Sequence, residues 1–88
     1  MTRAEIEAKI LEYFRKDFEI VNPGMDDDLR KIHGFDSIDA IELLLEIENL
    51  LNSELTQEEK KRAMDIRTIN QILDYTVSLA QARQPARG

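Results

Sequence analysis

The segment from Ser37 to Leu51 constrains the fold more than any other part of the chain, because its apolar residues recur at α-helical spacing. At about 100° per residue they form one stripe that covers roughly a third of the helix surface. This core stripe consists of Ala40, Leu43, Leu44, Ile47, Leu50 and Leu51. A helix with such a stripe has to bury it against other elements. The segment therefore predicts a helix in a bundle, with Asp36 as its N-cap.

A first helix is predicted over residues 2–17, where apolar residues alternate with charged ones at helical spacing. Thr2 followed by Glu5 matches a capping box. Residues 22–24, Asn-Pro-Gly, then interrupt regular structure, and a long connection follows over residues 25–34. Apolar residues within or beside the connection predict that it packs on the bundle: Ile20, Val21, Leu29, Ile32 and Phe35.

Two further helices complete the expected fold. Thr56 followed by Glu59 predicts a short polar helix over residues 57–63, and Thr68 predicts the start of the last helix. The residues of that last helix expected to face inward are Ile69, Ile72, Leu73, Thr76, Val77 and Ala80. Residues 81–88 are small, polar and proline-containing, so a flexible C-terminal tail is expected there.

The expected fold class is all-α. It is a four-helix bundle in a single domain over residues 1–80, with three longer helices, one short third helix and a long first loop. A chain of 88 residues is too short for two separate cores.

Composition excludes several classes of function. The chain has no Cys, which rules out disulfides, thiolate metal sites and thiol nucleophiles, and the single His33 cannot form a multi-histidine metal site. No apolar run approaches the roughly 20 residues that span a bilayer, and no signal-peptide pattern is present, so a cytoplasmic location is expected. The net charge of −6 argues against a nucleic acid partner.

Negative charge is concentrated in the middle of the chain. No Lys or Arg lies between Lys31 and Lys60. The same interval contains Asp36, Asp39, Glu42, Glu46, Glu48, Glu54, Glu58 and Glu59. A localised acidic field is suited to basic partner proteins, and a merely solvated helix face is the alternative.

The helix predicted over residues 37–51 has two more surface features beside its core stripe. They are an apolar strip, made of Ile38, Ile41 and Leu45, and an acidic flank, made of Asp39, Glu42 and Glu46. Exposed apolar residues rimmed by charge are typical of protein docking surfaces. The alternative is that the long connection covers the strip or that the strip widens the core.

Ser37 lies at the start of this helix, where a serine could be a nucleophile, a modification site or a plain helix-start residue. A hydrolase nucleophile needs a general base within reach, and His33 precedes a glycine outside the expected helix. No Gly-x-Ser-x-Gly elbow is present either, so the chain is not expected to be an enzyme. A phosphodiester on Ser37 would be favoured by unpaired backbone N–H groups and by the helix dipole.

Residues 34–43, Gly-Phe-Asp-Ser-Ile-Asp-Ala-Ile-Glu-Leu, resemble the acyl carrier protein signature Gly-x-Asp-Ser-Leu-Asp-x-x-Glu-Leu. Residues 26–29 look like the Asp-x-x-Leu stretch of that family, and residues 68–75 look like the opening of its fourth helix. The resemblance implies an acyl-carrier-like bundle with Ser37 as the phosphopantetheine attachment serine. A holo-carrier synthase would transfer the arm from coenzyme A with Mg²⁺ bound in the synthase, and the cargo would be held as a thioester.

The same resemblance implies how partner enzymes dock. The acidic positions that meet basic patches on partners are Asp36, Asp39, Glu42 and Glu48, and the apolar contact positions are Ile38, Ile41 and Leu45. The implied partners are a phosphopantetheinyl transferase and the acyl transferases, synthases or ligases that use the cargo. The carrier itself is expected to be a monomer without a metal site or a membrane span.

The expected function is to carry acyl intermediates for fatty-acid or related lipid or polyketide biosynthesis. The interior residues expected to shelter an acyl chain are Phe14, Leu43, Ile47, Ile72 and Tyr75. The chain departs from the fatty-acid pattern at Ile38, Glu46, Asn49, residues 50–56 and the basic residues 60–62. These departures make a specialised stand-alone carrier, for an unusual acyl, polyketide or aminoacyl group, the second choice to a housekeeping fatty-acid carrier. An aminoacyl carrier of the D-alanyl or peptide-synthetase type and a non-covalent helical adaptor remain as alternatives.

Overall fold

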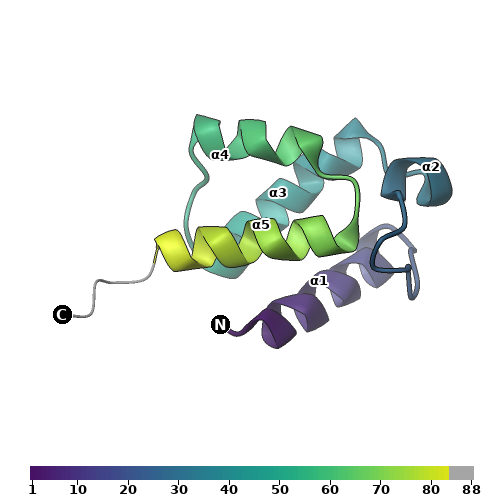
Figure 1. The fold of residues 1–88 in the computed structure, drawn as a ribbon, viewed down its shortest axis with the longest axis horizontal. Helices are drawn as coiled ribbons and strands as arrows, with labels where there is room; N and C mark the ends of the chain where they lie inside the picture. Colours follow the sequence, from purple (N-terminus) through teal and green to yellow (C-terminus); the bar gives the residue numbers. More distant parts are fainter. Residues whose placement is uncertain (84–88) are drawn as a thin grey trace.

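Residues 1–83 are described by a computed structural model, and within them the chain is helical without a strand (Figure 1). The elements are α1 (Arg3–Asp17), α2 (Leu29–His33), α3 (Ser37–Leu51), α4 (Gln57–Arg62), the 3₁₀-helix η1 (Ala63–Asp65) and α5 (Ile69–Ala82). The all-α bundle with three longer helices and a short one near residues 57–63 is therefore confirmed.

Capping residues determine where four of the helices begin. Capping boxes are formed at the starts of α1, α3, α4 and α5, by Thr2, Asp36, Thr56 and Thr68. In each box the cap side chain accepts a hydrogen bond from a first-turn N–H group, and a first-turn side chain accepts one from the cap's own N–H. These contacts span three residues, which is why the sequence predicted the helix starts.

The long connection contains a helix that the sequence did not predict. The Asp28 carboxylate caps α2 by accepting hydrogen bonds at 3.0 Å from two backbone N–H groups. Gly34 ends the helix with a φ of 67°, and its N–H donates to the carbonyl of Leu29. A helix of five residues is too short to show an apolar period, so the segment was expected to be a loop.

The connection packs on the bundle as predicted, but only through some of its apolar residues. Ile20, Leu29 and Phe35 are buried. Val21 and Ile32 are each 61% exposed, because they lie on the outer side of the connection.

The core is formed by apolar residues from α1, the connection, α3 and α5, and α1 lies beside α5 (Figure 1). Phe14 of α1 is fully buried in it, with its ring centroid 5.2 Å from that of Phe18 and 5.4 Å from that of Phe35. Phe35 immediately precedes the Asp36–Ser37 pair. Its burial therefore anchors the start of α3 in the core.

Helix α5 differs from its prediction in two respects. Val77 and Ala80 are only partly buried, whereas Leu79 is fully buried, because Leu79 lies one turn beyond Thr76 on the inward face. Residues 81 and 82 are helical and Arg83 is the C-cap. The expected tail over residues 81–88 was therefore placed to start too early in the sequence. Residues 84–88 lie outside the described part of the chain.

Candidate functional site

Ser37 is the first residue of α3, and its side chain is exposed. Within residues 1–83 its hydroxyl makes no hydrogen bond, so the oxygen is available for modification. The preceding residue, Asp36, accepts hydrogen bonds at 3.0 Å from the backbone N–H groups of Ile38 and Asp39. The helix start thus presents a free hydroxyl on a rigid, capped turn.

The same cap corrects one expectation about this helix end. A phosphodiester on Ser37 was expected to meet unpaired N–H groups, but the Asp36 carboxylate occupies those of Ile38 and Asp39. The Asp39 carboxylate in turn accepts from the N–H of Asp36 at 3.2 Å. Both carboxylates therefore lie close to Ser37, and of the first three N–H groups of α3 only that of Ser37 itself is left for an anion.

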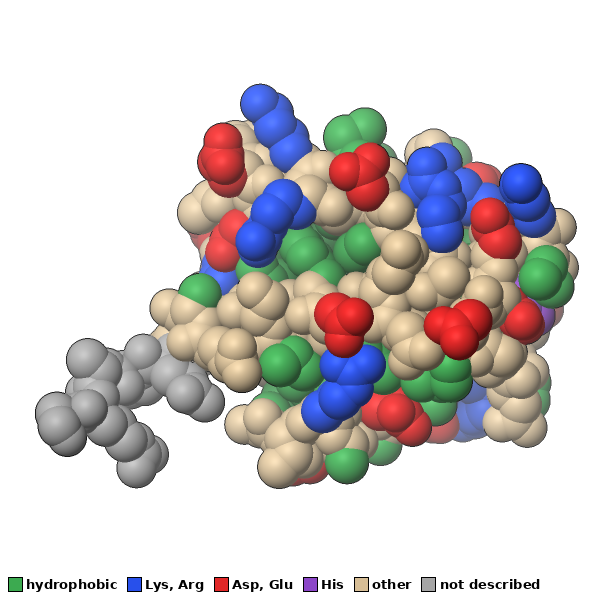
Figure 2. Space-filling model, viewed as in Figure 1, with side chains coloured by type: hydrophobic (Ala, Val, Ile, Leu, Met, Phe, Trp, Pro, Cys, Tyr) green, Lys and Arg blue, Asp and Glu red, His purple; other side chains and the backbone are tan. Residues whose placement is uncertain are grey.

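An apolar cavity of about 250 Å³ opens beside Ser37. Its lining comprises Arg30, Phe35, Ser37, Ala40, Ile41, Leu43, Leu44, Ile47, Lys60, Ala63, Met64, Ile66 and Tyr75. Figure 2 shows apolar side chains in a hollow between α4 and α5. Among the residues expected to shelter a cargo, Leu43, Ile47 and Tyr75 line the cavity, whereas Phe14 and Ile72 are buried in the core.

The described lining of this cavity contains no His, Asp or Glu. His33 instead lies with Nε2 at 3.1 Å from the carboxylate of Asp27. This contact, with the N–H of Gly24, lowers the pKa of Asp27. Within residues 1–83, His33 is therefore bonded to Asp27, and no hydrogen bond joins it to Ser37.

The apolar strip of α3 is open to solvent. Ile38, Ile41 and Leu45 are 67%, 61% and 56% exposed, so neither the connection nor the core covers them. Ile41 also lines the cavity, which places the middle of the strip beside the cavity. The strip thus has the exposure that a docking surface requires.

The acidic flank lies beside Tyr13 of α1. Burial and the carboxylates of Asp17, Glu42, Glu46 and Asp39 raise the pKa of Tyr13 to about 12. The part of the pKa increase that comes from these carboxylates indicates a negative potential along the flank. Glu42 is exposed, and its carboxylate has no hydrogen-bond or ion-pair partner within residues 1–83.

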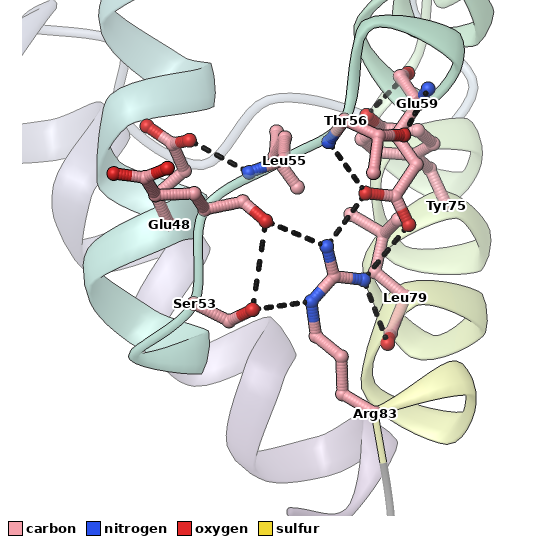
Figure 3. Close-up of polar contacts among 9 residues, drawn as sticks. Glu48, Ser53, Leu55, Thr56, Glu59, Tyr75, Leu79 and Arg83 are labelled. Carbon is pink, nitrogen blue, oxygen red and sulfur yellow. Dashed lines mark hydrogen bonds and ion pairs between the residues drawn. The ribbon is translucent and has the colours of Figure 1, made fainter.

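Glu48, the other acidic residue expected to dock partners, has a different contact. Its carboxylate is partly buried and accepts a hydrogen bond at 2.7 Å from the N–H of Leu55 (Figure 3). Glu48 thereby ties α3 to the segment that leads into α4. Of the four acidic positions, Glu42 is the one most available to a partner.

A polar network that the sequence did not predict holds α4 against α5 (Figure 3). The Arg83 guanidinium donates to both carboxylate oxygens of Glu59, at 2.6 Å and 2.8 Å, and to Ser53 Oγ at 2.8 Å. It also donates to the Glu54 carbonyl at 2.9 Å, and the Tyr75 hydroxyl donates to the Glu59 carbonyl at 2.6 Å. Because α4 supplies part of the cavity wall, this Arg83 network helps to define the cavity.

Membrane-spanning helices and metal centres are both absent from the described part of the chain. No helix in residues 1–83 has the length and apolarity to cross a membrane. The same residues contain no cluster of three or more potential metal ligands of the His, Cys, Asp or Glu type.

Comparison with known families agrees with the geometry at Ser37. A family model described as "Phosphopantetheine attachment site" matches residues 8–76, which include α3 and every residue that lines the cavity. A search of curated proteins finds no match. Domains of the matched family carry a covalently attached 4'-phosphopantetheine group. Because the match covers most of the chain, the protein belongs to this family of phosphopantetheine-binding carrier domains.

Proposed function

We propose that the protein is an acyl carrier and that Ser37 Oγ is the attachment point of its 4'-phosphopantetheine arm. The observation that carries the proposal is the exposed, unbonded hydroxyl of Ser37 at the mouth of an apolar cavity. When bound, the arm supplies a terminal thiol that holds the cargo as a thioester. The chain presents that cargo, and partner enzymes carry out the chemistry.

The lining of the cavity favours an acyl cargo over an aminoacyl cargo. Most of its side chains are apolar, and it contains no carboxylate to pair with the ammonium group of an amino acid. Its charged members, Arg30 and Lys60, would repel that group. An acyl chain has no charge to desolvate and would bury apolar surface there. We therefore favour fatty-acid or related lipid or polyketide biosynthesis over D-alanyl or peptide-synthetase-type transfer.

The attachment site is tested by incubating the apo protein with coenzyme A, Mg²⁺ and a broad-specificity phosphopantetheinyl transferase. The intact mass should increase by one arm, and Ser37→Ala should abolish the increase. Ser78→Ala is the matched control, because Ser78 is an exposed serine on α5 away from the cavity. A wild-type chain that never gains mass would overturn the proposal, and a Ser37→Ala chain that still gains mass would place the arm elsewhere.

The nature of the cargo is tested separately by thermal unfolding of the holo protein. An octanoyl group on the arm should raise the unfolding midpoint above that of the unloaded holo form, because it buries apolar surface in the cavity. Ala63→Phe should remove this increase by filling the cavity, whereas Ala4→Phe, at an exposed site on α1, should retain it. An increase with D-alanyl but not with octanoyl cargo would favour the aminoacyl alternative.

The adaptor alternative predicts a different pattern. A non-covalent adaptor would bind its partner helix through the apolar strip equally well in the wild type and in Ser37→Ala. Protein purified from its native host would then lack an arm. Detection of the arm in that material by mass spectrometry contradicts the adaptor.

A further inference from the structure

Two basic side chains, Arg30 from α2 and Lys60 from α4, line the same cavity as Ser37. They are exposed, and within residues 1–83 neither forms an ion pair or a side-chain hydrogen bond. In the sequence they lie near opposite ends of residues 32–59, the acidic stretch that contains Ser37 and has no Lys or Arg. The fold brings them to the edge of one apolar cavity, where an uncompensated pair of cations is suited to an anionic group.

The positions of both residues are set by ordered structure. Helix α2 is held by the buried Leu29, whose N–H donates at 2.8 Å to the carbonyl of Arg67. Lys60 follows Glu59, which is fixed by the Arg83 network. The backbones that carry the two cations are therefore held in place before any anion binds, which reduces the entropy lost on binding.

The chemistry of the carrier would place an anion near these cations. Attachment at Ser37 Oγ creates a phosphodiester at the cavity mouth. Of its first three N–H groups, the start of α3 offers only that of Ser37, because Asp36 already accepts from those of Ile38 and Asp39 and adds negative charge. The cations that line the cavity are the side chains able to compensate it.

We propose that Arg30 and Lys60 bind the phosphodiester of the arm and hold the arm across the cavity mouth. This inference rests on the proposed attachment at Ser37. It directs the first part of the arm toward α2 and α4. The outer part of the apolar strip, Ile38 and Leu45, and the acidic Glu42 then remain open to partner enzymes. Arg30 and Lys60 are positioning residues, because they orient the arm without contacting the reacting thiol.

Phosphorus NMR of the unloaded holo protein tests the proposal directly. In the wild type, the phosphodiester signal should differ in position from that of the same protein unfolded in denaturant, and high salt should reduce the difference. The double variant Arg30→Gln/Lys60→Gln should lose most of the difference and give a narrower line. The matched control is Lys31→Gln/Lys61→Gln, which removes the same charge from neighbouring exposed residues that do not line the cavity.

Two further measurements complete this test. Circular dichroism should show that all variants retain helical structure, since the four side chains are exposed. The charge-conserving Arg30→Lys/Lys60→Arg variant should keep the wild-type signal. A signal unchanged in Arg30→Gln/Lys60→Gln, or changed equally in the control, overturns the proposal.

The source of the anion is tested with two cargos on the arm. Butyryl and succinyl groups have similar length, but only the succinyl group adds a carboxylate. If the basic pair binds the arm itself, the variant should alter the phosphorus signal equally with both cargos. An effect confined to the succinyl form assigns the pair to a cargo carboxylate and overturns our assignment. Failure of the proposed function is distinguishable, since the intact mass would then show no arm.

Discussion

At the residue scale, Gly34 is required by the geometry of the chain just before the site. Its φ of 67° lies in the left-handed region and allows α2 to end at His33, three residues before Asp36. A Cβ atom added there would meet no atom within 4 Å, so any effect of substitution comes from backbone strain alone. Gly34 thereby connects α2, the helix that contains Arg30, to the start of α3 through a short turn.

Gly34→Ala should lower the free energy of unfolding by about 1–2 kcal/mol, because a β-carbon disfavours the left-handed conformation. Gly34→Asn should lower it less, since asparagine adopts this conformation more readily. Urea denaturation followed by circular dichroism measures both. Equal losses in the two variants would indicate a cause other than backbone strain.

Arg83 is the second residue with a specific structural role, because its guanidinium joins α5, the α3–α4 connection and α4. The paired side chains are well covered, with 20% of the Arg83 side chain and 15% of the Glu59 side chain exposed. Arg83→Gln should therefore lower the free energy of unfolding at neutral pH by about 1–3 kcal/mol, as expected for hydrogen bonds to charged groups. Arg15→Gln, which removes an exposed pair with Glu12, should have a smaller effect.

The same pair predicts a pH dependence. Hydrogen bonds from Arg83 and from the N–H of Thr56 lower the pKa of Glu59 from 4.5 to about 2 in the folded protein. The stabilisation is present above the unfolded value and is lost as the pH falls from about 4.5 to about 2, because protonation of Glu59 then favours the unfolded chain. Wild type should lose stability more steeply over this range than Arg83→Gln. If acid titration shows that the free energy of unfolding falls equally steeply in the two proteins, the assignment of this pH dependence to the Glu59–Arg83 pair is contradicted.

At the element scale, α3 has two faces with different tasks. Its buried residues, Leu43 and Ile47, hold it in the core. The apolar strip and the acidic flank remain on the outside, next to Ser37. One helix thus fixes the proposed attachment residue and presents an exposed surface in a constant relation to it.

Charge reversal on the flank tests the docking role. Glu42→Lys should raise the KM of the phosphopantetheinyl transferase for the carrier by about tenfold, because one favourable contact with a basic patch becomes repulsive. High salt should reduce the difference between the two proteins. Glu7→Lys, on α1, is the control and should change KM little. An unchanged KM for Glu42→Lys would indicate that the flank is only a solvated surface.

At the scale of the whole molecule, one core supports both the site and the cavity. Phe14, Phe18 and Phe35 bring α1, the connection and the start of α3 together. Because Phe35 is two residues from Ser37, loss of this cluster should loosen the start of α3 as well as the core.

Phe14→Ala should lower the free energy of unfolding by about 3–5 kcal/mol through lost burial and a cavity. A domain of this size has a total of roughly 4–13 kcal/mol, so the variant should be close to unfolding at physiological temperature. Phe18→Ala, at a partly exposed position, should have a smaller effect. Differential scanning calorimetry compares the two midpoints, and equal losses would contradict the central position of Phe14.

The sequence predicted those features that depend on neighbouring residues. Thr2, Asp36, Thr56 and Thr68 form their capping contacts within the first turn, so the helix starts were visible in the pattern. Helical spacing likewise separated the buried stripe of α3 from its exposed strip. The position of Ser37 at a capped helix start followed from the same local information.

Only the tertiary structure decided which distant residues meet. Arg83 and Glu59 are 24 residues apart, and Arg30 and Lys60 reach one cavity from different helices. Their contacts leave no periodic pattern, because they depend on how the helices pack and not on how each helix forms. By itself the sequence determined the four helices that begin with capping boxes and the serine at the start of one of them. Packing determined the cavity, its basic side chains and the network that fixes its wall.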